Sequence, residues 1–163
     1  MGKRKNDKSM TPEIVNRKAR HDYHIESTIE CGVALAGSEV KAVREGNVSI
    51  GEGYARVDER TNELWLHNVH ISEYGPARGS ANAHRPTAAR KLLAHKREIR
   101  KLAQETLPKG VTLIPLKIYF KNGWAKVLIG VARGKTHGDK RQDNRKREAD
   151  REIRRAMTRK RIG

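Results

Sequence analysis

Two apolar runs separated by Asn122 and Gly123 constrain the fold of this 163-residue chain more than any other feature. The runs, within residues 111–131, are rich in strand-forming side chains, and an Asn-Gly pair fits the two-residue type I′ turn of a β-hairpin. Such a turn also fixes which residues of the two strands lie opposite each other. The predicted pairs are Phe120 with Ala125, Tyr119 with Lys126, Ile118 with Val127, Leu116 with Ile129, and Ile114 with Val131.

Alternation along this hairpin separates two faces. One face is apolar and is expected to cover the core: Ile114, Leu116, Ile118, Phe120, Val127, Ile129 and Val131. The other face is basic and aromatic: Lys117, Tyr119, Lys121, Trp124 and Lys126. Aromatic rings can stack on unpaired bases and lysines neutralise phosphate, so this second face is a candidate RNA-binding surface. The alternative is a solvated sheet face that is stabilised by cross-strand pairs.

Other segments show the alternation of apolar and polar residues that predicts strands. Residues 23–35 carry apolar side chains mostly at odd positions, and Gly32 marks a bend within them. Two shorter strands are expected at residues 54–58 and 64–71, joined by a polar turn. The chain is therefore expected to be mainly β.

Two segments have the residue spacing of helices. Ser38 can cap a short helix that ends at Gly46. Residues 87–106 place most of their apolar side chains in one stripe at 3.6-residue spacing, which predicts a long amphipathic helix. Leu93 falls outside that stripe, so it is either an ordinary exposed leucine or a contact for a partner.

The net charge of +17, from 36 Lys and Arg against 19 Asp and Glu, limits the partners that the chain can have. Such an excess binds polyanions by releasing their condensed counterions, so nucleic acid is the leading partner. An anionic membrane would attract the same charge. However, no apolar run approaches the roughly 20 residues of a membrane-spanning helix, and the N-terminus has no apolar signal core. We therefore expect a cytoplasmic protein without a membrane partner.

Apolar residues become rare at both ends of the chain, which predicts three regions. Residues 1–20 are expected to form a basic, mobile N-terminal arm, apart from Ile14 and Val15. Residues 21–133 are expected to form the folded domain. Residues 134–163 form a basic tail that cannot build its own core, although its residues favour helix. This tail is expected to be disordered when free and helical against RNA, or to have no definite structure at all.

Few residues suggest chemistry. Cys31 is the only cysteine, which excludes an internal disulfide, and it lies in an apolar strand where a thiol acts as a small buried hydrophobe. His67 and His70 are three residues apart in a predicted strand and should face opposite sides, and no zinc-ligand spacing is present. No glycine pattern predicts a phosphate-binding loop. We expect no metal, no cofactor and no catalytic residue, so an RNA-processing enzyme is supported only by the charge.

Six short motifs follow one another along nearly the whole chain: Asn16-Arg17-Lys18-Ala19, Gly37-Ser38-Glu39-Val40-Lys41, Arg90-Lys91-Leu92-Leu93, Lys121-Asn122-Gly123-Trp124, Ile129-Gly130-Val131-Ala132-Arg133-Gly134-Lys135 and Asp139-Lys140-Arg141. Each motif alone is weak, but their ordered set is specific. In that order they resemble the SmpB family. The resemblance implies a small antiparallel β-barrel, similar to the oligonucleotide-binding fold, with flanking helices and a basic C-terminal tail.

The resemblance also implies which residues bind RNA. Together with the hairpin face, these are Asn16, Arg17, Lys18, His21, Glu30, Leu93, Lys117, Tyr119, Trp124 and Lys126. Glu30 fits less simply, because a carboxylate repels phosphate; it would accept hydrogen bonds from bases, orient a lysine, or be a paired carboxylate at the barrel rim. In the tail, the residues implied to act inside the ribosome are Lys135, His137, Asp139, Lys140 and Arg141. Many relatives have an aromatic residue or histidine where this chain has Gly138, so His137 would act in its place.

The function that the resemblance implies is ribosome rescue by a monomeric RNA-binding protein that is not an enzyme. Such a protein holds the tRNA-like end of transfer-messenger RNA and delivers it, together with a GTP-carrying elongation factor, to ribosomes stalled on messages without a stop codon. Its tail enters the empty decoding site and the mRNA channel, against the ribosomal RNA of the small subunit. The alternative is a structural ribosomal or ribosome-assembly protein that binds ribosomal RNA stably.

Overall fold

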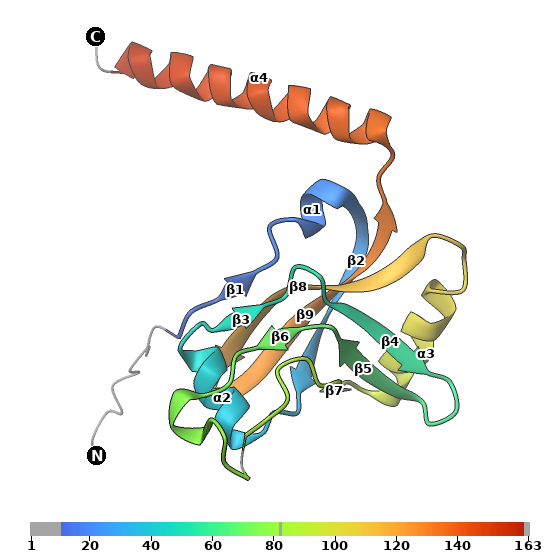
Figure 1. Cartoon of the computed structure of the whole chain (residues 1–163). Helices are drawn as coiled ribbons and strands as arrows, with labels where there is room; N and C mark the ends of the chain where they lie inside the picture. The colour runs from blue at the N-terminus through green and yellow to red at the C-terminus, as the bar shows by residue number, and fades with distance from the viewer. Residues whose placement is uncertain (1–10, 82, 162–163) are drawn as a thin grey trace, which may run out of the picture.

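The computed structural model describes residues 11–81 and 83–161, with side chains through residue 158 (Figure 1). Its strands are β1 (Ile14–Val15), β2 (Tyr23–Val33), β3 (Val48–Ser49), β4 (Tyr54–Asp58), β5 (Glu63–His67), β6 (His70–Ile71), β7 (Arg90–Leu93), β8 (Val111–Lys121) and β9 (Trp124–Gly134). Its helices are α1 (Ala19–Asp22), α2 (Gly37–Arg44), the short 3-10 helix η1 (Gly75–Ala77), α3 (Lys96–Glu105) and α4 (His137–Arg161).

The main sheet contains antiparallel strands in the order β1-β8-β4-β5-β7-β2-β9, and β9 also pairs with β8. This last pairing closes the sheet into a ring, with helices at its edges (Figure 1). We call this ring and the elements packed on it the barrel. The mainly β, antiparallel fold with flanking helices that the sequence predicts is confirmed.

The central hairpin forms around Asn122 and Gly123, as expected. Their φ angles of 52° and 80° are both positive, which a type I′ turn requires and which Asn and Gly tolerate best. The three predicted pairs nearest the turn are confirmed: Phe120 with Ala125, Tyr119 with Lys126, and Ile118 with Val127. The turn therefore sets the register of the strand ends that carry the basic and aromatic side chains.

A bulge between Pro115 and Lys117 shifts the register farther from the turn. A proline cannot donate a hydrogen bond to the ladder, and a bulge accommodates the extra residue. Beyond it, two predicted pairs are wrong: Leu116 with Ile129, and Ile114 with Val131. As a result, Ile114 and Leu116 leave the main core and pack with Ala19 in a second apolar cluster.

The long helix predicted for residues 87–106 is wrong in its first half. Residues 90–93 form β7, and only residues 96–105 form α3. β7 pairs with both β2 and β5, and Leu92 is buried where they meet. A strand of four residues is too short to display its two-residue period, so Leu92 fits the helical stripe that follows, whereas Leu93 does not.

Two smaller predictions are also wrong. The strand expected at 64–71 is broken at Asn68, which has a φ of 55°, so His67 and His70 lie in two different sheets. Ser38 does not cap α2, because that helix begins one residue earlier. Instead, the Glu39 carboxylate accepts a hydrogen bond from the backbone N–H of Ala36, at 2.8 Å.

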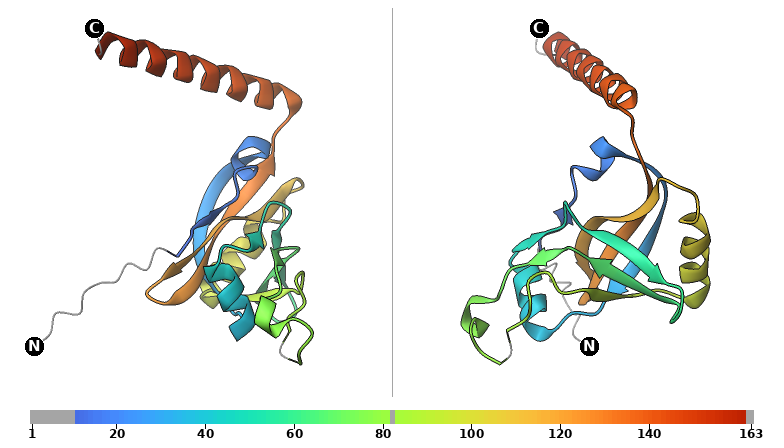
Figure 2. Two further views of the ribbon diagram at one scale, coloured as in Figure 1. Left: turned by 60° about the vertical axis from the view of Figure 1, so that its left-hand side comes forward. Right: turned by 45° about the vertical axis from the view of Figure 1, so that its right-hand side comes forward.

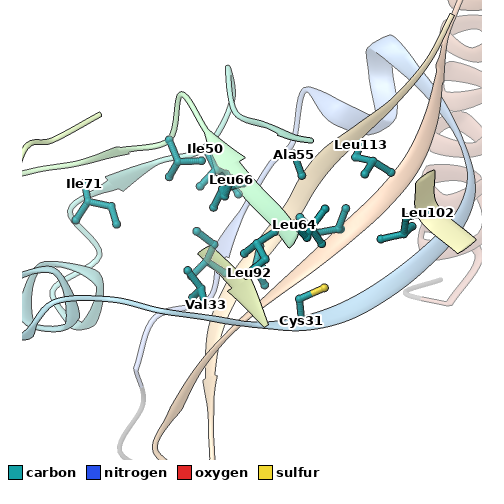
Figure 3. Close-up of a cluster of buried hydrophobic side chains, with 14 of the residues drawn as sticks. Cys31, Val33, Ile50, Ala55, Leu64, Leu66, Ile71, Leu92, Leu102 and Leu113 are labelled. Atoms are coloured by element: carbon teal, nitrogen blue, oxygen red, sulfur yellow. The ribbon is translucent and has the colours of Figure 1, made fainter. Parts of the chain in front are cut away.

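Apolar side chains from most strands and from α2 and α3 fill the interior of the barrel. Figure 3 shows Cys31 and Leu64 within this cluster, and both are fully buried. Burial raises the pKa of the Cys31 thiol to about 12, so it stays protonated at neutral pH. The prediction that Cys31 is a small buried hydrophobe is confirmed.

One buried ion pair joins two of the sequence motifs. Arg90 Nε donates to Glu39 Oε1 at 2.7 Å, and the two side chains are 2% and 7% exposed. The remaining guanidinium nitrogens donate to the backbone oxygens of Val69 and Pro86, at 2.7 and 2.9 Å. The pair therefore fixes α2 against β7 and the loop before it, which gives these two motif residues a structural role.

The prediction of a mobile N-terminal arm is wrong for residues 16–20, which belong to the barrel together with Ile14 and Val15. β1 pairs with β8, and Ala19 is buried. Residues 1–10 of the expected arm lie outside the described residues. At the other end, α4 extends away from the barrel (Figure 2). That the tail is disordered when free and becomes helical against RNA stays a prediction. In the described ranges, no helix is long and apolar enough to cross a membrane.

Candidate nucleic-acid interface

One row of paired residues crosses four strands of the barrel. Leu93 of β7 pairs with Gly32 of β2, Gly32 pairs with Lys126 of β9, and Lys126 pairs with Tyr119 of β8. Paired residues on neighbouring strands point to the same side of a sheet, so Leu93, Lys126 and Tyr119 share one surface. We call this surface, with Glu30, Lys117, Lys121 and Trp124, the outer face.

Gly32 is needed where Leu93 crosses it. A Cβ atom at position 32 would lie 3.3 Å from the Cβ of Leu93, which is closer than ordinary van der Waals contact. Leu93 is nevertheless 54% exposed, so its side chain lies over β2 and is open to solvent on its other side. The sequence predicted only a bend at Gly32, and nothing in it indicates that Leu93 lies there.

Glu30 is paired within the outer face rather than free. The Tyr119 hydroxyl donates a hydrogen bond to its carboxylate, and Lys121 Nζ lies 3.3 Å from Glu30 Oε1. Both contacts hold the pKa of the Glu30 carboxyl below its usual range, with the tyrosine hydrogen bond the larger cause. Partial burial and the hydrogen bond to Glu30 raise the pKa of Tyr119 to about 12. The carboxylate is thus ionised and oriented, with lone pairs left for a further donor.

The three lysines of the outer face differ in their partners. Lys117 Nζ lies 2.7 Å from Glu13 Oε1 and 4.9 Å from the centre of the Tyr119 ring. Lys121 is paired with Glu30. Lys126 makes no ion pair with any residue that the structure describes. Its ammonium is therefore the one of the three that can bind a phosphate without giving up a contact inside the protein.

Trp124 lies at the end of the hairpin, opposite Lys121. It is 73% exposed, and its odd-even position in β9 puts it on the same side as Lys126. A ring that exposed adds little to the core but offers a flat surface for a base. The hairpin face predicted from sequence is thus present, with Glu30 and Leu93 brought onto it by strands far apart in the chain.

Asn16 is buried and only 7% exposed. Its amide nitrogen donates to the backbone oxygens of Pro115 and Ile50, at 3.0 and 3.4 Å, and its amide oxygen accepts from the N–H of Ala19 at 3.1 Å. These bonds satisfy both ends of the side chain inside the protein. Asn16 therefore holds the turn into α1, and its contact with RNA stays a prediction.

Arg17, Lys18 and His21 lie around α1, away from the outer face. α1 leads directly into Tyr23, which pairs with Gly134, whereas Gly32 at the other end of β2 pairs with Lys126. At the ordinary rise of a strand, these two ends are roughly 30 Å apart. The residues predicted to bind RNA therefore form two groups, with a long strand between them.

The predicted tail residues also divide in two. His137 and Arg141 are exposed to solvent. Lys135 and Lys140 instead contact α1, and Asp139 accepts a hydrogen bond from Thr136 just before α4. Asp22 forms an ion pair with Lys140. It was not among the predicted residues, because no spacing in the sequence links α1 to the tail.

Comparison with known proteins agrees with this geometry. The family model of SmpB protein matches residues 13–159. A protein of Levilactobacillus brevis named SsrA-binding protein is 54% identical over 160 residues, covering 96% of this chain and 98% of its relative. A namesake from Thermobifida fusca is 50% identical over 161 residues, covering 98% of each.

A solved structure described as "tmRNA-SmpB: a journey to the center of the bacterial ribosome" is also similar. Its TM-score is 0.64 at 46% identity, and the match covers 80% of this chain and 93% of the other. The agreement in sequence thus extends through the barrel and most of the tail, and it is accompanied by agreement in fold. The chain belongs to the SmpB family.

Proposed function

We propose that this protein binds the tRNA-like domain of transfer-messenger RNA and delivers it to stalled bacterial ribosomes. The observation that carries the proposal is the outer face, where four strands bring Glu30, Leu93, Tyr119 and Lys126 onto one surface. Relatives over nearly the whole chain are named for binding SsrA RNA, and the similar solved structure is described as a tmRNA-SmpB structure.

Each side chain of the outer face has a distinct use in holding folded RNA. Lys126 would neutralise a phosphate, and Trp124 would stack on an unpaired base. Glu30, held by Tyr119, would accept a hydrogen bond from a base amino group, which makes its contact selective for sequence or shape rather than for charge. Leu93 would cover the apolar face of a base or sugar beside it.

The tail would act after the RNA is bound. In α4 the side chains of residues 144–158 are all exposed, and many of them are Arg or Lys. A basic helix that buries none of its side chains between residues 144 and 158 suits a channel lined by RNA. We propose that it occupies the empty decoding site and mRNA channel, with His137 and Arg141 free to contact ribosomal RNA.

The remaining features of the proposal follow from that role. The protein would act in the cytoplasm as a monomer without catalytic activity, and a GTP-carrying elongation factor would accompany the RNA to the ribosome. The division of labour between a barrel that captures RNA and a tail that acts in the ribosome belongs to the same proposal.

The test is a binding titration of the whole protein against the tRNA-like domain of transfer-messenger RNA, with ordinary tRNA as competitor, over a series of salt concentrations. We expect binding that persists at physiological salt and resists the competitor, because Glu30 and Leu93 add contacts that salt does not screen. Weak binding that tRNA displaces equally well would overturn the proposal. It would favour a ribosomal or assembly protein, which should stay with purified subunits through a high-salt wash.

A further inference from the structure

Tyr119 differs from Trp124, the other aromatic residue of the outer face, in how far its ring is already engaged. Trp124 is 73% exposed. The ring centre of Tyr119 lies 4.9 Å from the ammonium of Lys117, and that ammonium is held in turn by Glu13, at 2.7 Å. The hydroxyl of Tyr119 donates to the carboxylate of Glu30. Both the ring and the hydroxyl of Tyr119 therefore have partners inside the protein.

The hydrogen bond between Tyr119 and Glu30 spans a strand. Tyr119 lies on β8 and Glu30 on β2, and β9 pairs with both strands between them. Neighbouring strands lie about 4.8 Å apart, so the backbones of β8 and β2 are separated by about 10 Å. Both side chains must therefore extend over β9 for the hydroxyl to reach the carboxylate. The bond runs across the surface to which the proposed function assigns the RNA.

The other contact of Glu30 is weaker. Its partner is Lys121, whose ammonium lies 3.3 Å from Oε1, and the two side chains are 34% and 57% exposed. An ion pair so open to water holds its side chains loosely. Tyrosine has only two side-chain torsions, so it is the stiffer partner. In agreement with this, the Tyr119 hydrogen bond lowers the pKa of the Glu30 carboxyl more than Lys121 does.

The orientation of the carboxylate decides how well it can read a base. A hydrogen bond from a base amino group weakens steeply when its angle departs from linearity. An unrestrained glutamate would lose rotamer freedom on binding, which lowers affinity. A carboxylate that is already held in one direction avoids that loss, and it accepts only from donors that approach along its free lone pairs.

We propose that Tyr119 is a positioning residue, which does not stack on RNA but holds the Glu30 carboxylate in the direction from which it reads a base. Lys117, held by Glu13, keeps the ring of Tyr119 in place. Of the two aromatic side chains of the outer face, only Trp124 is then left to stack on a base. The reading of a base by Glu30 rests on the proposed function, whereas its orientation by Tyr119 does not.

The first experiment tests the orientation without RNA. Carbon-13 NMR follows the side-chain carboxyl carbon of Glu30 as the pH is lowered. Tyr119→Phe should move the pKa of Glu30 up toward the usual glutamate range, because a phenyl ring cannot donate. Tyr54→Phe is the matched control, since it removes a hydroxyl from an exposed tyrosine of β4, and it should leave Glu30 unchanged. An unchanged Glu30 titration in Tyr119→Phe would overturn the proposal.

The second experiment measures the affinity of the whole protein for the tRNA-like domain of transfer-messenger RNA. Phenylalanine also stacks on bases, so Tyr119→Phe would keep full affinity if the ring itself stacked. We expect instead a loss of about tenfold, with an unchanged slope of log affinity against log salt, because no charge is removed. Glu30→Ala should lose at least as much. The double variant should lose no more than Glu30→Ala alone, since Tyr119 then has no carboxylate to position.

The outcomes separate the proposal from the function on which it rests. Full affinity in Tyr119→Phe, losses that add in the double variant, or a changed salt slope would each overturn it. Failure of the unchanged protein to bind the RNA would overturn the proposed function, and with it the reading of a base by Glu30. The NMR titration would still decide whether Tyr119 holds the carboxylate.

A third measurement distinguishes positioning from a merely structural role of the hydroxyl. A difluorinated tyrosine at position 119, whose phenol ionises nearer neutral pH, loses its donor while the fold is kept. RNA affinity relative to the unchanged protein should fall as the pH rises through that lowered pKa, because a phenolate repels Glu30. The other charged groups near the ring keep their state over this range: Glu13, Lys117, Lys121 and Lys126. The same substitution at Tyr54 should leave the relative affinity independent of pH, and a flat profile at position 119 would overturn the proposal.

Discussion

The barrel and the tail helix are both basic, but their positions are determined by different means. Side chains of the outer face stand on strands whose other faces form the buried core, so their places are set before RNA arrives. α4 has no buried apolar side chain along residues 144–158, and its ion pairs with the rest of the protein lie at its first two turns. The comparison indicates that the barrel is preorganised by its core, whereas the tail helix is joined to it by a few polar contacts.

Removing the tail gives the largest expected effect. A chain that ends at Gly134 should keep the thermal unfolding midpoint of the barrel within a few degrees and bind the tRNA-like domain as before, because α4 contributes nothing to the core. Tagging of stalled peptides in a reconstituted translation system should be lost. Full tagging by the shortened chain would show that the barrel alone is sufficient for tagging, and that the tail has no separate role.

Two ion pairs of similar chemistry sharpen the comparison through stability. Arg90→Ala would leave the buried Glu39 carboxylate without its cation and the backbone oxygen of Val69 without its guanidinium donor, so we expect a loss of about 3–5 kcal/mol in the free energy of unfolding. Lys140→Ala breaks the half-buried pair with Asp22 and should cost less than about 1 kcal/mol. Urea unfolding of both variants measures the difference, with Lys146→Ala as a control. Equal losses of unfolding free energy would mean that the Asp22–Lys140 pair stabilises the fold as much as the buried pair does.

Lys126→Ala tests the outer face with a smaller effect. Lys126 has no ion pair among the described residues, so its loss should remove one phosphate contact and reduce the slope of log affinity against log salt by about 0.7 to 0.9. Lys109→Ala, an exposed change in the loop before β8, is the control and should leave the slope unchanged. An unchanged slope in Lys126→Ala would place the RNA elsewhere on the barrel.

Sequence reasoning succeeded where a local signal determined the structure. The Asn122-Gly123 turn fixed the register of its neighbours, and with it the shared side of Tyr119, Trp124 and Lys126. It failed beyond Pro115, because a bulge depends on packing against other strands that one hairpin does not reveal. It also failed at β7, whose four residues carry too little pattern to be separated from the helix that follows.

The outer face could be predicted only in part for the same reason. Its hairpin half was readable from alternation, but Glu30 and Leu93 reach it through the pairing of β2 with β9 and β7, which joins residues far apart in the chain. The resemblance to the SmpB family pointed to Glu30 and Leu93, but it did not show where the two residues lie. No pattern in the sequence pointed to Asp22 at the start of α4, because its ion pair is with Lys140, more than a hundred residues later.

The smallest expected effect is on the titration of Tyr119, which tests the outer face separately from the tail helix. Its pKa is raised to about 12 by partial burial and by its hydrogen bond to Glu30. The neutral phenol is thus favoured in the folded state, and its contribution is complete below the usual tyrosine pKa of about 10 and is lost as the pH rises toward 12. A pH titration followed by the ultraviolet absorbance of tyrosinate should show a step near pH 12 that is absent in Tyr119→Phe. In Glu30→Gln that step should move to lower pH.

The carboxylates at the start of α4 should titrate at the opposite end of the pH scale. Hydrogen bonds and nearby cations hold the pKa values of Asp22, Asp139 and Asp143 below their usual range. Their contribution is therefore complete above that range and is lost only as the pH falls through the lowered values. Carbon-13 NMR should show the carboxyl carbons of Asp22, Asp139 and Asp143 titrating below the usual aspartate range and unchanged through the alkaline titration of Tyr119. A change at these carboxyl carbons in alkali, with the barrel still folded, would mean that the outer face and the start of α4 are coupled.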